Sequence, residues 1–538
     1  MEPRLEGLVP RRLGRVIQGL MAEEPVVILQ GPRAVGKTTL LRRLGEEAGA
    51  PIIDLDDLAT RDAVAADPGR FVDGPSPILI DEIQHVPDVL DAIKAELNRD
   101  LRPGRFVITG STNHAALPDA ARRLTGRAHT VDVLPLSQGE IARHDESFVA
   151  TLIESPEALL GGRSSTSRDA YAARAIAGGY PIALSRTASG RARWFDDYVR
   201  QIIERDVVEL SRIRQRQLLP RLLAQVASQT GQLLNIHRAA TRIGMDPSTA
   251  ENYTKLLEAV FLIRRLPAWG TTLGSRVGAA PKVHVVDPGL AAHLLRLTES
   301  KLAARSAQAQ TAFVHLLETF VAGEMFKQIG WVDGVREFGH WRTRDGDEVD
   351  VVIERDDGKV AAVAVKAGER VAGGDLDALR KLRSRLGDAF LGGVCLYTGG
   401  LSYRHDDRLD LAHVRGAHLL DRRPPPRGSA RGSTRSPRAR APASRSGSRS
   451  TAVRPSSAAP VAGNVPRPCA HTTSITASPA VEYEFDFGDG WIHRCTVLEV
   501  EGTPDAYGVR PKGPVVVWGW GSMPDQYGRT TPDGGDEG

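Results

Sequence analysis

The chain has few cysteines and no long apolar run. Cys395, Cys469 and Cys495 are scattered through 538 residues and form no C-x-x-C pair, which argues against a structural zinc site or a disulfide framework and favours a reducing compartment. The N-terminal stretch lacks the apolar core of a signal peptide, and no segment approaches the apolar length that spans a membrane. We therefore expect a soluble, cytoplasmic protein without a membrane partner.

Length and composition indicate a multidomain globular protein. A chain of 538 residues is too long for one hydrophobic core and predicts about three to four domains. Hydrophobic residues make up 41% of the chain, which is ordinary for globular proteins. The formal net charge of +4 is small, and it hides a local excess of arginine near the C-terminal end.

The segment Val26–Leu41 carries the most informative motif. It reads as a buried strand, the loop GPRAVGKT and an amphipathic helix, and Gly31, Gly36, Lys37 and Thr38 satisfy the phosphate-loop spacing G-x-x-x-x-G-K-[ST]. The glycines let backbone N–H groups wrap a polyphosphate, the lysine reaches its β- and γ-phosphates, and the threonine hydroxyl serves Mg²⁺. The residues expected to bind the nucleotide are Gly31, Pro32, Arg33, Ala34, Val35, Gly36, Lys37, Thr38 and Thr39.

A second motif predicts the catalytic part of a nucleotide hydrolase. The short apolar strand Ile78–Ile80 ends in Asp81 and Glu82. We expect Asp81 to complete the Mg²⁺ site with Thr38, and Glu82 to orient or deprotonate the attacking water. The alternative for such an acidic pair is a solvated helix start.

A third predicted strand, Phe106–Ile108, ends in a cluster of polar side chains. Ligands of open parallel sheets bind outside the carboxyl ends of the strands. Asn113 or Ser111 could therefore sense the γ-phosphate or position water. The alternative is a polar turn that only caps the next helix.

An arginine is also expected, because transition-state charge needs a cation. Arg127 follows the third strand and could act within the chain or reach a neighbouring subunit. Arg122 and Arg123 are rivals for this role, and a surface position is the alternative for each of the three.

The motifs GPRAVGKTTLL, ILIDEIQHVP, ITGSTN and LTGRAHTVDVLPLSQGE, in that order, resemble a large family of prokaryotic AAA-type ATPases with a C-terminal domain of unknown function. The likeness continues through GGYPIAL, WFDDYVRQIIERDV, PKVHVVDPGLAAHLL and LLETFVAGE, over residues 8–420. It implies ATP and Mg²⁺ as cofactors, and no guanine-reading N-K-x-D motif opposes ATP. The chain departs from the family at Ile182, where an acidic residue is usual.

The expected fold class is α/β, with a P-loop AAA-type ATPase core at residues 1–150. Strands and helices alternate there, which predicts a parallel sheet covered on both faces. Residues 151–215 are helical and charged, consistent with a helical lid. The predicted strands of the core are Val26–Leu29, Ile52–Leu55, Ile78–Ile80, Phe106–Ile108 and Val131–Leu134.

Residues 216–300 predict a winged-helix-like domain. Leu218–Gln229, Ile236–Ile243 and Asp246–Ala259 read as helices, with Asp246 as the N-cap of the third, and Leu262–Leu266 and Val283–Val286 as wing strands. On the third helix, four polar residues would face solvent and could contact DNA: Ser248, Thr249, Asn252 and Lys255.

Two glutamates on that helix, Glu251 and Glu258, weaken the DNA hypothesis. The alternative is a packing module between the ATPase core and the C-terminal domain.

Residues 301–420 resemble a restriction-endonuclease-like α/β domain. Glu318, Asp350 and Lys366 follow the order of a nuclease core, in which carboxylates hold Mg²⁺ and the lysine activates water or steadies charge. Ala364 stands where nucleases carry a glutamate. We therefore expect a vestigial nuclease site without activity. The alternative is a fold kept for structure or binding, with Lys366 as a surface charge.

The C-terminal part changes composition abruptly. Residues 421–478 form an Arg/Pro/Ser-rich segment that predicts a disordered linker. It could bind phosphate backbones without specificity, act as a solvated linker, or record a frameshift or gene fusion.

Residues 479–538 predict a small β-rich tail, because Tyr483, Phe485 and Phe487 alternate with acids and Asp489–Gly490 marks a turn. The tail resembles part of a small bacterial domain first described from a plasmid reading frame.

Taken together, these features predict an ATP-binding, Mg²⁺-dependent ATP-hydrolysing switch. It would couple its nucleotide state to a macromolecular partner, which could be DNA, a protein or a second copy of the chain. The alternative is a DNA-associated binding protein with a slow or vestigial ATPase and an inactive nuclease-like domain.

Overall fold

The computed structural model describes residues 7–113, 124–160, 163–207, 210, 215–272 and 279–414, and the strands 480–485 and 491–496. The chain divides into two compact units, Met1–Ala430 and Arg431–Gly538, which are described separately. Among the described residues, no helix has the length and apolarity needed to cross a membrane.

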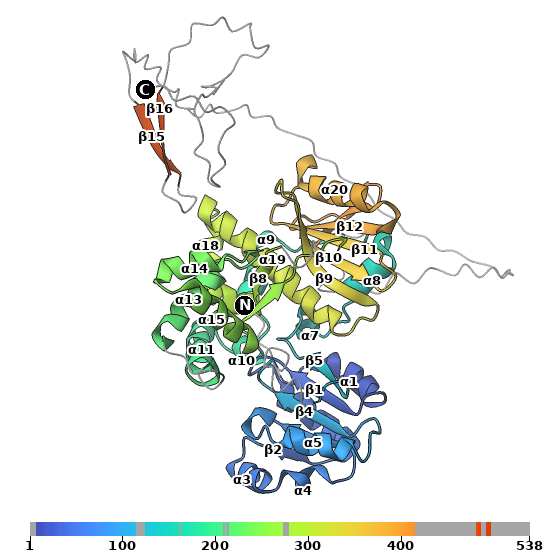
Figure 1. The fold of residues 1–538 in the computed structure, drawn as a ribbon. Coiled ribbons are helices and arrows are strands. Elements are labelled where there is room, and N and C mark those ends of the chain that lie inside the picture. The colour runs from blue at the N-terminus through green and yellow to red at the C-terminus, as the bar shows by residue number, and fades with distance from the viewer. Residues whose placement is uncertain are drawn as a thin grey trace, which may run out of the picture. The chain divides into compact units, whose positions relative to one another are not determined.

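The first unit begins with a five-stranded parallel sheet (Figure 1). Its strand order is β2-β3-β4-β1-β5, so β4 separates β1 from β3. The parallel α/β core expected from the sequence is confirmed. The strands are β1 (Val26–Gln30), β2 (Ile52–Asp54), β3 (Ile78–Asp81), β4 (Phe106–Gly110) and β5 (Ala128–Asp132).

One strand lies earlier than predicted. The sequence favours Val131–Leu134, whereas β5 spans Ala128–Asp132. This strand is at the edge of the sheet, and His129 and Thr130 are exposed. Its first half therefore lacks the apolar pattern on which the prediction depended.

Helices cover both faces of this sheet. Alternate residues of β1 enter two different cores: Val27 belongs to the core that includes Leu41 of α2, whereas Val26 belongs to the core that includes Val89 of α5. A central strand buried on both faces reads as a continuous apolar run, as β1 does. The covering helices are α1 (Leu13–Met21), α2 (Lys37–Ala48), α3 (Leu58–Ala66), α4 (Pro68–Val72) and α5 (Val89–Leu97).

The segment expected to form a lid is mainly helical where it is described, although residues 163–167 are irregular. Helix α11 continues into a π-helical stretch, Ile202–Val207. The described α-helices between β5 and this stretch are α7 (Gln138–Ala142), α8 (Phe148–Glu154), α9 (Arg168–Ala177), α10 (Pro181–Leu184) and α11 (Ala188–Gln201).

The next region contains three helices and a three-stranded antiparallel sheet of order β6-β8-β7. The expected cap is present, because Asp246 accepts a hydrogen bond from the N–H of Thr249 (2.9 Å) at the start of α15. The elements are α13 (Leu219–Ala227), β6 (Gln232–Leu233), α14 (Ile236–Ile243), α15 (Pro247–Ala259), β7 (Ile263–Leu266) and β8 (Lys282–Val285).

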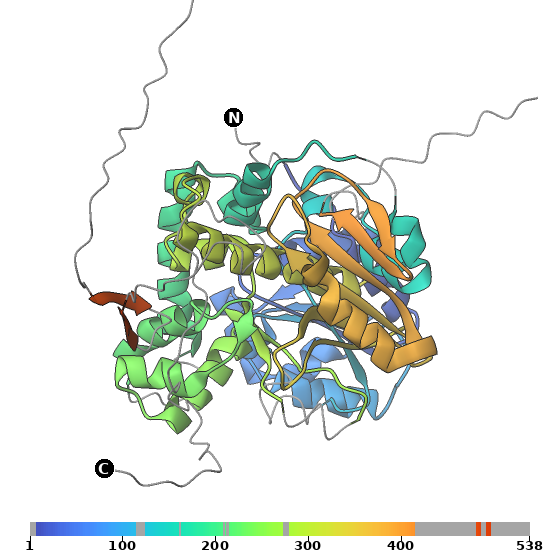
Figure 2. The same ribbon diagram turned by 90° about the horizontal axis from the view of Figure 1, so that it is seen from above.

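Two short helices, α17 (Pro288–Leu294) and α18 (Glu299–Ala303), lead to the long helix α19 (Ala307–Ile329). A six-stranded mixed sheet of order β13-β14-β12-β11-β10-β9 follows. Helix α19 covers one face and α20 (Asp377–Leu386) the other (Figure 2). The strands are β9 (Val335–Arg342), β10 (Glu348–Arg355), β11 (Val360–Lys366), β12 (Phe390–Tyr397), β13 (Tyr403–Asp406) and β14 (Leu409–His413).

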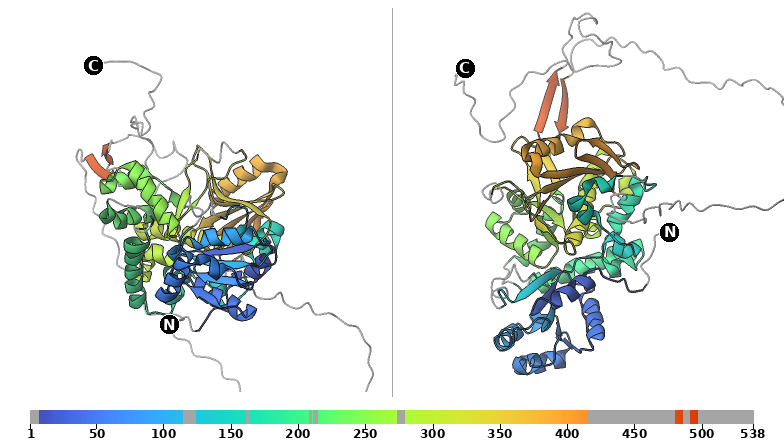
Figure 3. Two further views of the ribbon diagram at one scale, coloured as in Figure 1. Left: turned by 60° about the horizontal axis from the view of Figure 1, so that its bottom comes forward. Right: turned by 90° about the vertical axis from the view of Figure 1, so that its right-hand side faces the viewer.

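The second unit is described only at two antiparallel strands, β15 (Ala480–Phe485) and β16 (Trp491–Thr496), which run side by side (Figure 3). Phe485 pairs with Trp491, and the two strands lie within the tail that the sequence predicts to be β-rich. The predicted linker 421–478, Phe487 and the turn Asp489–Gly490 lie outside the described residues.

Candidate functional site

The phosphate loop joins β1 to α2, and its backbone conformation requires glycine. Gly31 and Gly36 have φ values of 153° and 95°, and a Cβ atom on Gly31 would lie 2.2 Å from the carbonyl oxygen of Val133. Ala34 also has a positive φ, 62°. Left-handed residues in such loops shape concave backbones whose N–H groups bind anions.

Lys37 is a buried ammonium that has only backbone carbonyls as hydrogen-bond partners here. Its Nζ donates to the carbonyl oxygens of Gly31 and Pro32, each at 2.9 Å. Burial lowers the pKa of Lys37 to about 8, although the charge of Glu82 opposes this shift. An anionic polyphosphate would supply the counter-charge that the buried ammonium lacks.

Asp81 and Thr38 lie together where the sequence predicts the Mg²⁺ site. Thr109 Oγ1 donates to Asp81 Oδ1, and the Thr38 hydroxyl is close enough to the Asp81 carboxylate to influence its pKa. Burial raises the pKa of Asp81, and the hydroxyls of Thr109 and Thr38 oppose that rise. A hydroxyl and a carboxylate side by side are oxygen ligands of the kind Mg²⁺ takes, so these residues fit the ion.

Glu82 follows β3 in a left-handed conformation, with φ 55° and ψ 52°. Its N–H donates to Thr109 Oγ1 (2.9 Å), and its carboxylate accepts from the side-chain amide of Gln84. The same amide donates to Ser111 Oγ (3.1 Å). Glu82 is thereby connected to the carboxyl end of β4, and strained backbone of this kind often marks functional sites.

Arg33 links the phosphate loop to the helical segment after α11. Its Nε donates to Asp206 Oδ2 at 2.6 Å, and its Nη1 lies 3.9 Å from the Glu82 carboxylate. Asp206 belongs to the π-helical stretch Ile202–Val207, a conformation that is frequent at functional sites. The nucleotide loop and the predicted lid therefore share a salt bridge.

Asn113 lies just beyond β4, the strand between β1 and β3. Its N–H donates to the carbonyl oxygen of Ala259 at 2.7 Å, and Ala259 is the last residue of α15. A second contact joins the same regions, because Arg264 of β7 pairs with Asp132 of β5 at 3.0 Å. The end of β4 is thus in direct contact with the end of α15.

Arg127 and the phosphate loop lie at opposite ends of the sheet's strands. Arg127 precedes Ala128, which pairs with Val26 at the amino end of β1, whereas the phosphate loop follows the carboxyl end. Its Nη1 donates to Asn98 Oδ1 (2.7 Å), beyond α5. Within one chain the structure does not bring Arg127 to Lys37. A role in a neighbouring subunit stays a prediction, and Arg122 and Arg123 lie outside the described residues.

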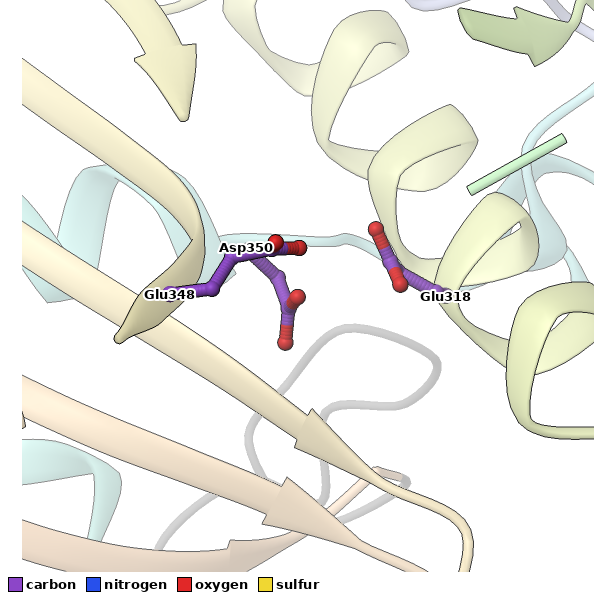
Figure 4. Close-up of side chains that lie close together, drawn as sticks. All are labelled: Glu318, Glu348 and Asp350. Atoms are coloured by element: carbon purple, nitrogen blue, oxygen red, sulfur yellow. The ribbon is translucent and has the colours of Figure 1, made fainter. Parts of the chain in front are cut away.

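A second cluster brings together Glu318 of α19 with Glu348 and Asp350 of β10 (Figure 4). One oxygen of each carboxylate lies within 4.8 Å of the others. The ammonium of Lys282, from β8, hydrogen-bonds Glu318 (2.7 Å) and Asp350 (2.8 Å) and forms an ion pair with Glu348.

Lys282 is fully buried, with 0% of its side chain exposed. Burial alone would lower the pKa of Lys282, but Asp350, Glu318 and Glu348 outweigh it and raise the pKa. Lys366, the lysine expected at this site, instead pairs with Asp375 at 3.6 Å. Of the expected nuclease residues, Glu318 and Asp350 come together, and the cation between them is Lys282.

Several of these residues escaped the sequence analysis. Glu348 stands two positions before Asp350 on a strand, so the two carboxylates share a face, a signal that the pattern EVD offers. Lys282 interrupts an apolar strand, which is unusual for a lysine. The partners Asp206 and Gln84 carry no comparable local signal, because only the tertiary fold brings them to Arg33 and Glu82.

Comparisons with known families agree with the geometry. Residues 23–142 match the family described as AAA domain, residues 314–415 match a domain of unknown function (DUF4143), and residues 168–301 match another (DUF8612). These matches support a prokaryotic AAA-type ATPase family with a C-terminal domain of unknown function. The AAA match and the phosphate loop together support ATP binding and hydrolysis.

Two curated relatives are the uncharacterized proteins Rv2008c of Mycobacterium tuberculosis and Mb2031c of Mycobacterium bovis. Each is 27% identical over 334 residues, which are 61% of this chain and 68% of the relative.

Among solved structures, a Walker-type ATPase of Pyrococcus abyssi is 14% identical, with a TM-score of 0.31, over 55% of this chain and 98% of that one. The RuvB Holliday junction branch migration motor of Thermotoga maritima is 17% identical, with a TM-score of 0.25, over 49% and 93%. At these TM-scores the likeness carries no argument about function.

Proposed function

We propose that the protein is an Mg²⁺-dependent ATPase that couples its nucleotide state to a macromolecular partner. The observation that carries the enzymatic part is the meeting of Lys37, Thr38, Asp81 and Glu82 at the carboxyl ends of β1 and β3. Lys37 would bind the β- and γ-phosphates, and Glu82 would orient and deprotonate water. Mg²⁺, held by Thr38 and Asp81, would neutralise phosphate charge.

The contact between Asn113 and Ala259 supports the coupling part. A γ-phosphate bound beside Asn113 would displace the end of β4, and the hydrogen bond passes that displacement to α15. The salt bridge between Arg33 and Asp206 supplies a second connection, from the phosphate loop to the π-helical stretch. Ligand-dependent changes at both contacts would favour different arrangements of the partner-binding region.

DNA is the partner that we propose first. The order of α13, β6, α14, α15, β7 and β8 supports the winged-helix-like interpretation, in which α15 is the recognition helix. Ser248, Asn252 and Lys255 are exposed on this helix. The guanidinium of Arg265 pairs with Glu251 (2.9 Å) and Glu258 (3.3 Å), so the two acids repel phosphate less than the sequence suggested.

ATP turnover by the purified full-length chain, with and without duplex DNA, tests this proposal. We expect turnover that DNA stimulates and that falls at least a hundredfold in Glu82→Gln, because the amide cannot accept the proton of water. ATP binding should survive in that variant. Turnover that is unchanged in Glu82→Gln would overturn the assignment of the base, and turnover indifferent to DNA would direct the search to protein partners.

The second candidate function, a DNA-associated binding protein with a slow ATPase, rests on the exposed face of α15. It predicts a salt-sensitive shift of duplex DNA that persists in Glu82→Gln, together with negligible wild-type turnover. A DNA shift that requires both ATP and an intact Glu82 would instead favour the switch.

A further inference from the structure

We propose that Lys282 is a built-in cation that takes the place of the metal ion in the nuclease-like centre. The C-terminal domain would then hold no catalytic metal, and the centre would be an ionic joint between β8, α19 and β10. This inference stands on the cluster of Figure 4 and is independent of the ATPase site.

The geometry of the cluster matches one ammonium. A lysine ammonium has three N–H donors and no acceptor, and three carboxylates surround Lys282 Nζ. Those of Glu318 and Asp350 accept at 2.7 and 2.8 Å, and Glu348 is also in ion-pair contact. Each donor therefore has one carboxylate as a partner, so the ammonium occupies the space where a metal ion would meet the same oxygens.

The remaining donor set does not fit a catalytic divalent ion. Asp350 Oδ2 already accepts the N–H of Val365 at 2.8 Å, and Ala364 supplies no further carboxylate. A metal ion at this position would lie beside a buried positive charge, which disfavours a second cation. The lysine that the nuclease pattern expects, Lys366, pairs with Asp375 instead.

Lys282 is held so that it cannot easily leave. Its strand, β8, is the middle strand of the sheet β6-β8-β7, where Lys282 pairs with Leu233 on one side and Leu266 on the other. Its side chain has no exposed surface. Moving the ammonium out of the cluster would leave the buried Glu318 and the half-buried Asp350 without this cation, while Glu348 would keep its ion pair with Arg342.

The joint connects segments that are far apart in the sequence. Lys282 belongs to the winged-helix-like region, whereas Glu318 and Asp350 belong to the nuclease-like domain. Buried charges of this kind act together, because removing one partner leaves the others unpaired. Strand β8 and the C-terminal sheet are therefore expected to move as one body when the nucleotide state changes.

Manganese binding to the nucleotide-free, full-length chain tests the proposal. Every protein in the comparison carries Asp81→Asn, so that the P-loop site is the same in all of them and does not contribute to the differences between them. Electron paramagnetic resonance counts bound Mn²⁺. We expect Lys282→Ala to gain one saturable Mn²⁺ site, at least tenfold tighter than any site of the protein that retains Lys282. Combining Asp350→Asn with Lys282→Ala should abolish that gain. Lys366→Ala is the matched control, and it should gain no site.

Two results would overturn the inference. One is that the protein that retains Lys282 already binds Mn²⁺ and that Asp350→Asn abolishes this binding, which would show that the metal and the lysine share the cluster. The other is a folded Lys282→Ala protein that binds no additional Mn²⁺. If Lys282→Ala does not fold, Lys282→Met replaces it, because methionine keeps most of the packing volume. Mn²⁺ binding by the protein that retains Lys282, with and without Asp350→Asn, tests the inference independently.

Discussion

Lys37 shows how burial at a single residue prepares a site for an anion. Within the described part of the chain its ammonium hydrogen-bonds two backbone carbonyls and no carboxylate, so the nearby charges of Glu82 and Asp81 offset its burial only in part. Burial therefore lowers its pKa to about 8. A bound polyphosphate would raise the pKa of Lys37 again, because nearby negative charge stabilises the ammonium.

This shift predicts a pH dependence of ATP binding. Above about pH 8, Lys37 of the free protein loses its proton, and binding ATP must restore it. We expect the dissociation constant of ATP to rise up to tenfold for each pH unit above 8, measured by calorimetry between pH 7 and 9.5. The variant Lys37→Met should bind ATP at least a hundredfold more weakly, with a flat profile over this range. A pH-independent wild-type affinity would contradict the assignment.

Gly31 predicts a steric effect at the same loop. The variant Gly31→Ala would place a Cβ atom 2.2 Å from the carbonyl oxygen of Val133, so the loop must shift and ATP affinity should fall at least tenfold. Gly49→Ala is the matched control, because Gly49 also has a positive φ (64°) but has open space around it. Its cost should be limited to about 1 kcal/mol of stability, with ATP affinity unchanged. Equal ATP affinity in the two variants would argue against the close contact.

At the scale of elements, helix α15 combines a local and a tertiary role. Its start is specified locally, by the Asp246 cap. Its end is specified by the fold, since the carbonyl of Ala259 accepts from Asn113 of the ATPase core. A helix held in this way at its final turn can respond to the core while presenting its exposed residues to a partner.

The exposed face of α15 predicts an effect of charge on DNA affinity. Lys255 is exposed and contacts Glu251 only at 3.9 Å. The variant Lys255→Glu should weaken binding of duplex DNA about three- to tenfold and reduce its salt dependence, because one phosphate contact is lost. Lys94→Glu, an equal charge change at an exposed residue of α5, is the control. An equal loss in both variants would indicate a nonspecific effect of net charge, which a filter-binding titration over several salt concentrations distinguishes.

At the scale of the whole first unit, buried polar groups connect segments remote in sequence. Glu324 of α19 accepts from the N–H of Gln138 (2.8 Å), and Lys327 donates to the carbonyl of Leu136 (3.0 Å). Asp287 accepts from the N–H of Gly179 at 2.6 Å. These contacts join the N-terminal half of the unit to its C-terminal half, whereas the Lys282 cluster joins segments within the C-terminal half.

Two buried histidines close to Lys282, His284 and His340, predict sensitivity to acid. Burial lowers the pKa of His284 to about 3, whereas an unfolded histidine titrates near 6.5. The stabilising contribution of neutral His284 is present above pH 6.5 and is lost as the pH falls toward 3, because the unfolded chain then binds a proton that the folded chain does not. The loss reaches up to about 1.4 kcal/mol per pH unit. Urea unfolding should show a shallower loss between pH 6.5 and 5 in His284→Gln, and an identical slope would contradict the prediction.

The sequence alone determined the parallel α/β core and the position of the phosphate loop between β1 and α2. The strand, the glycine spacing and the lysine stand within sixteen residues of one another, and the acidic pair ends its own strand, so local pattern and chain direction suffice to predict them. Edge strand β5 was misplaced, because its exposed half carries no apolar signal.

Only the tertiary structure decided which cation lies between Glu318 and Asp350. Glu318 and Asp350 were recognisable by their order in the chain, but the cation between them comes from Lys282, on another sheet. Only the fold brings Arg33 to Asp206, and only the fold brings Asn113 to Ala259. Periodicity reports which face of an element is buried, but it contains no information about which distant charge or carbonyl will be buried against it. That pairing is set by packing, since a buried charge must find its partner wherever the fold brings one.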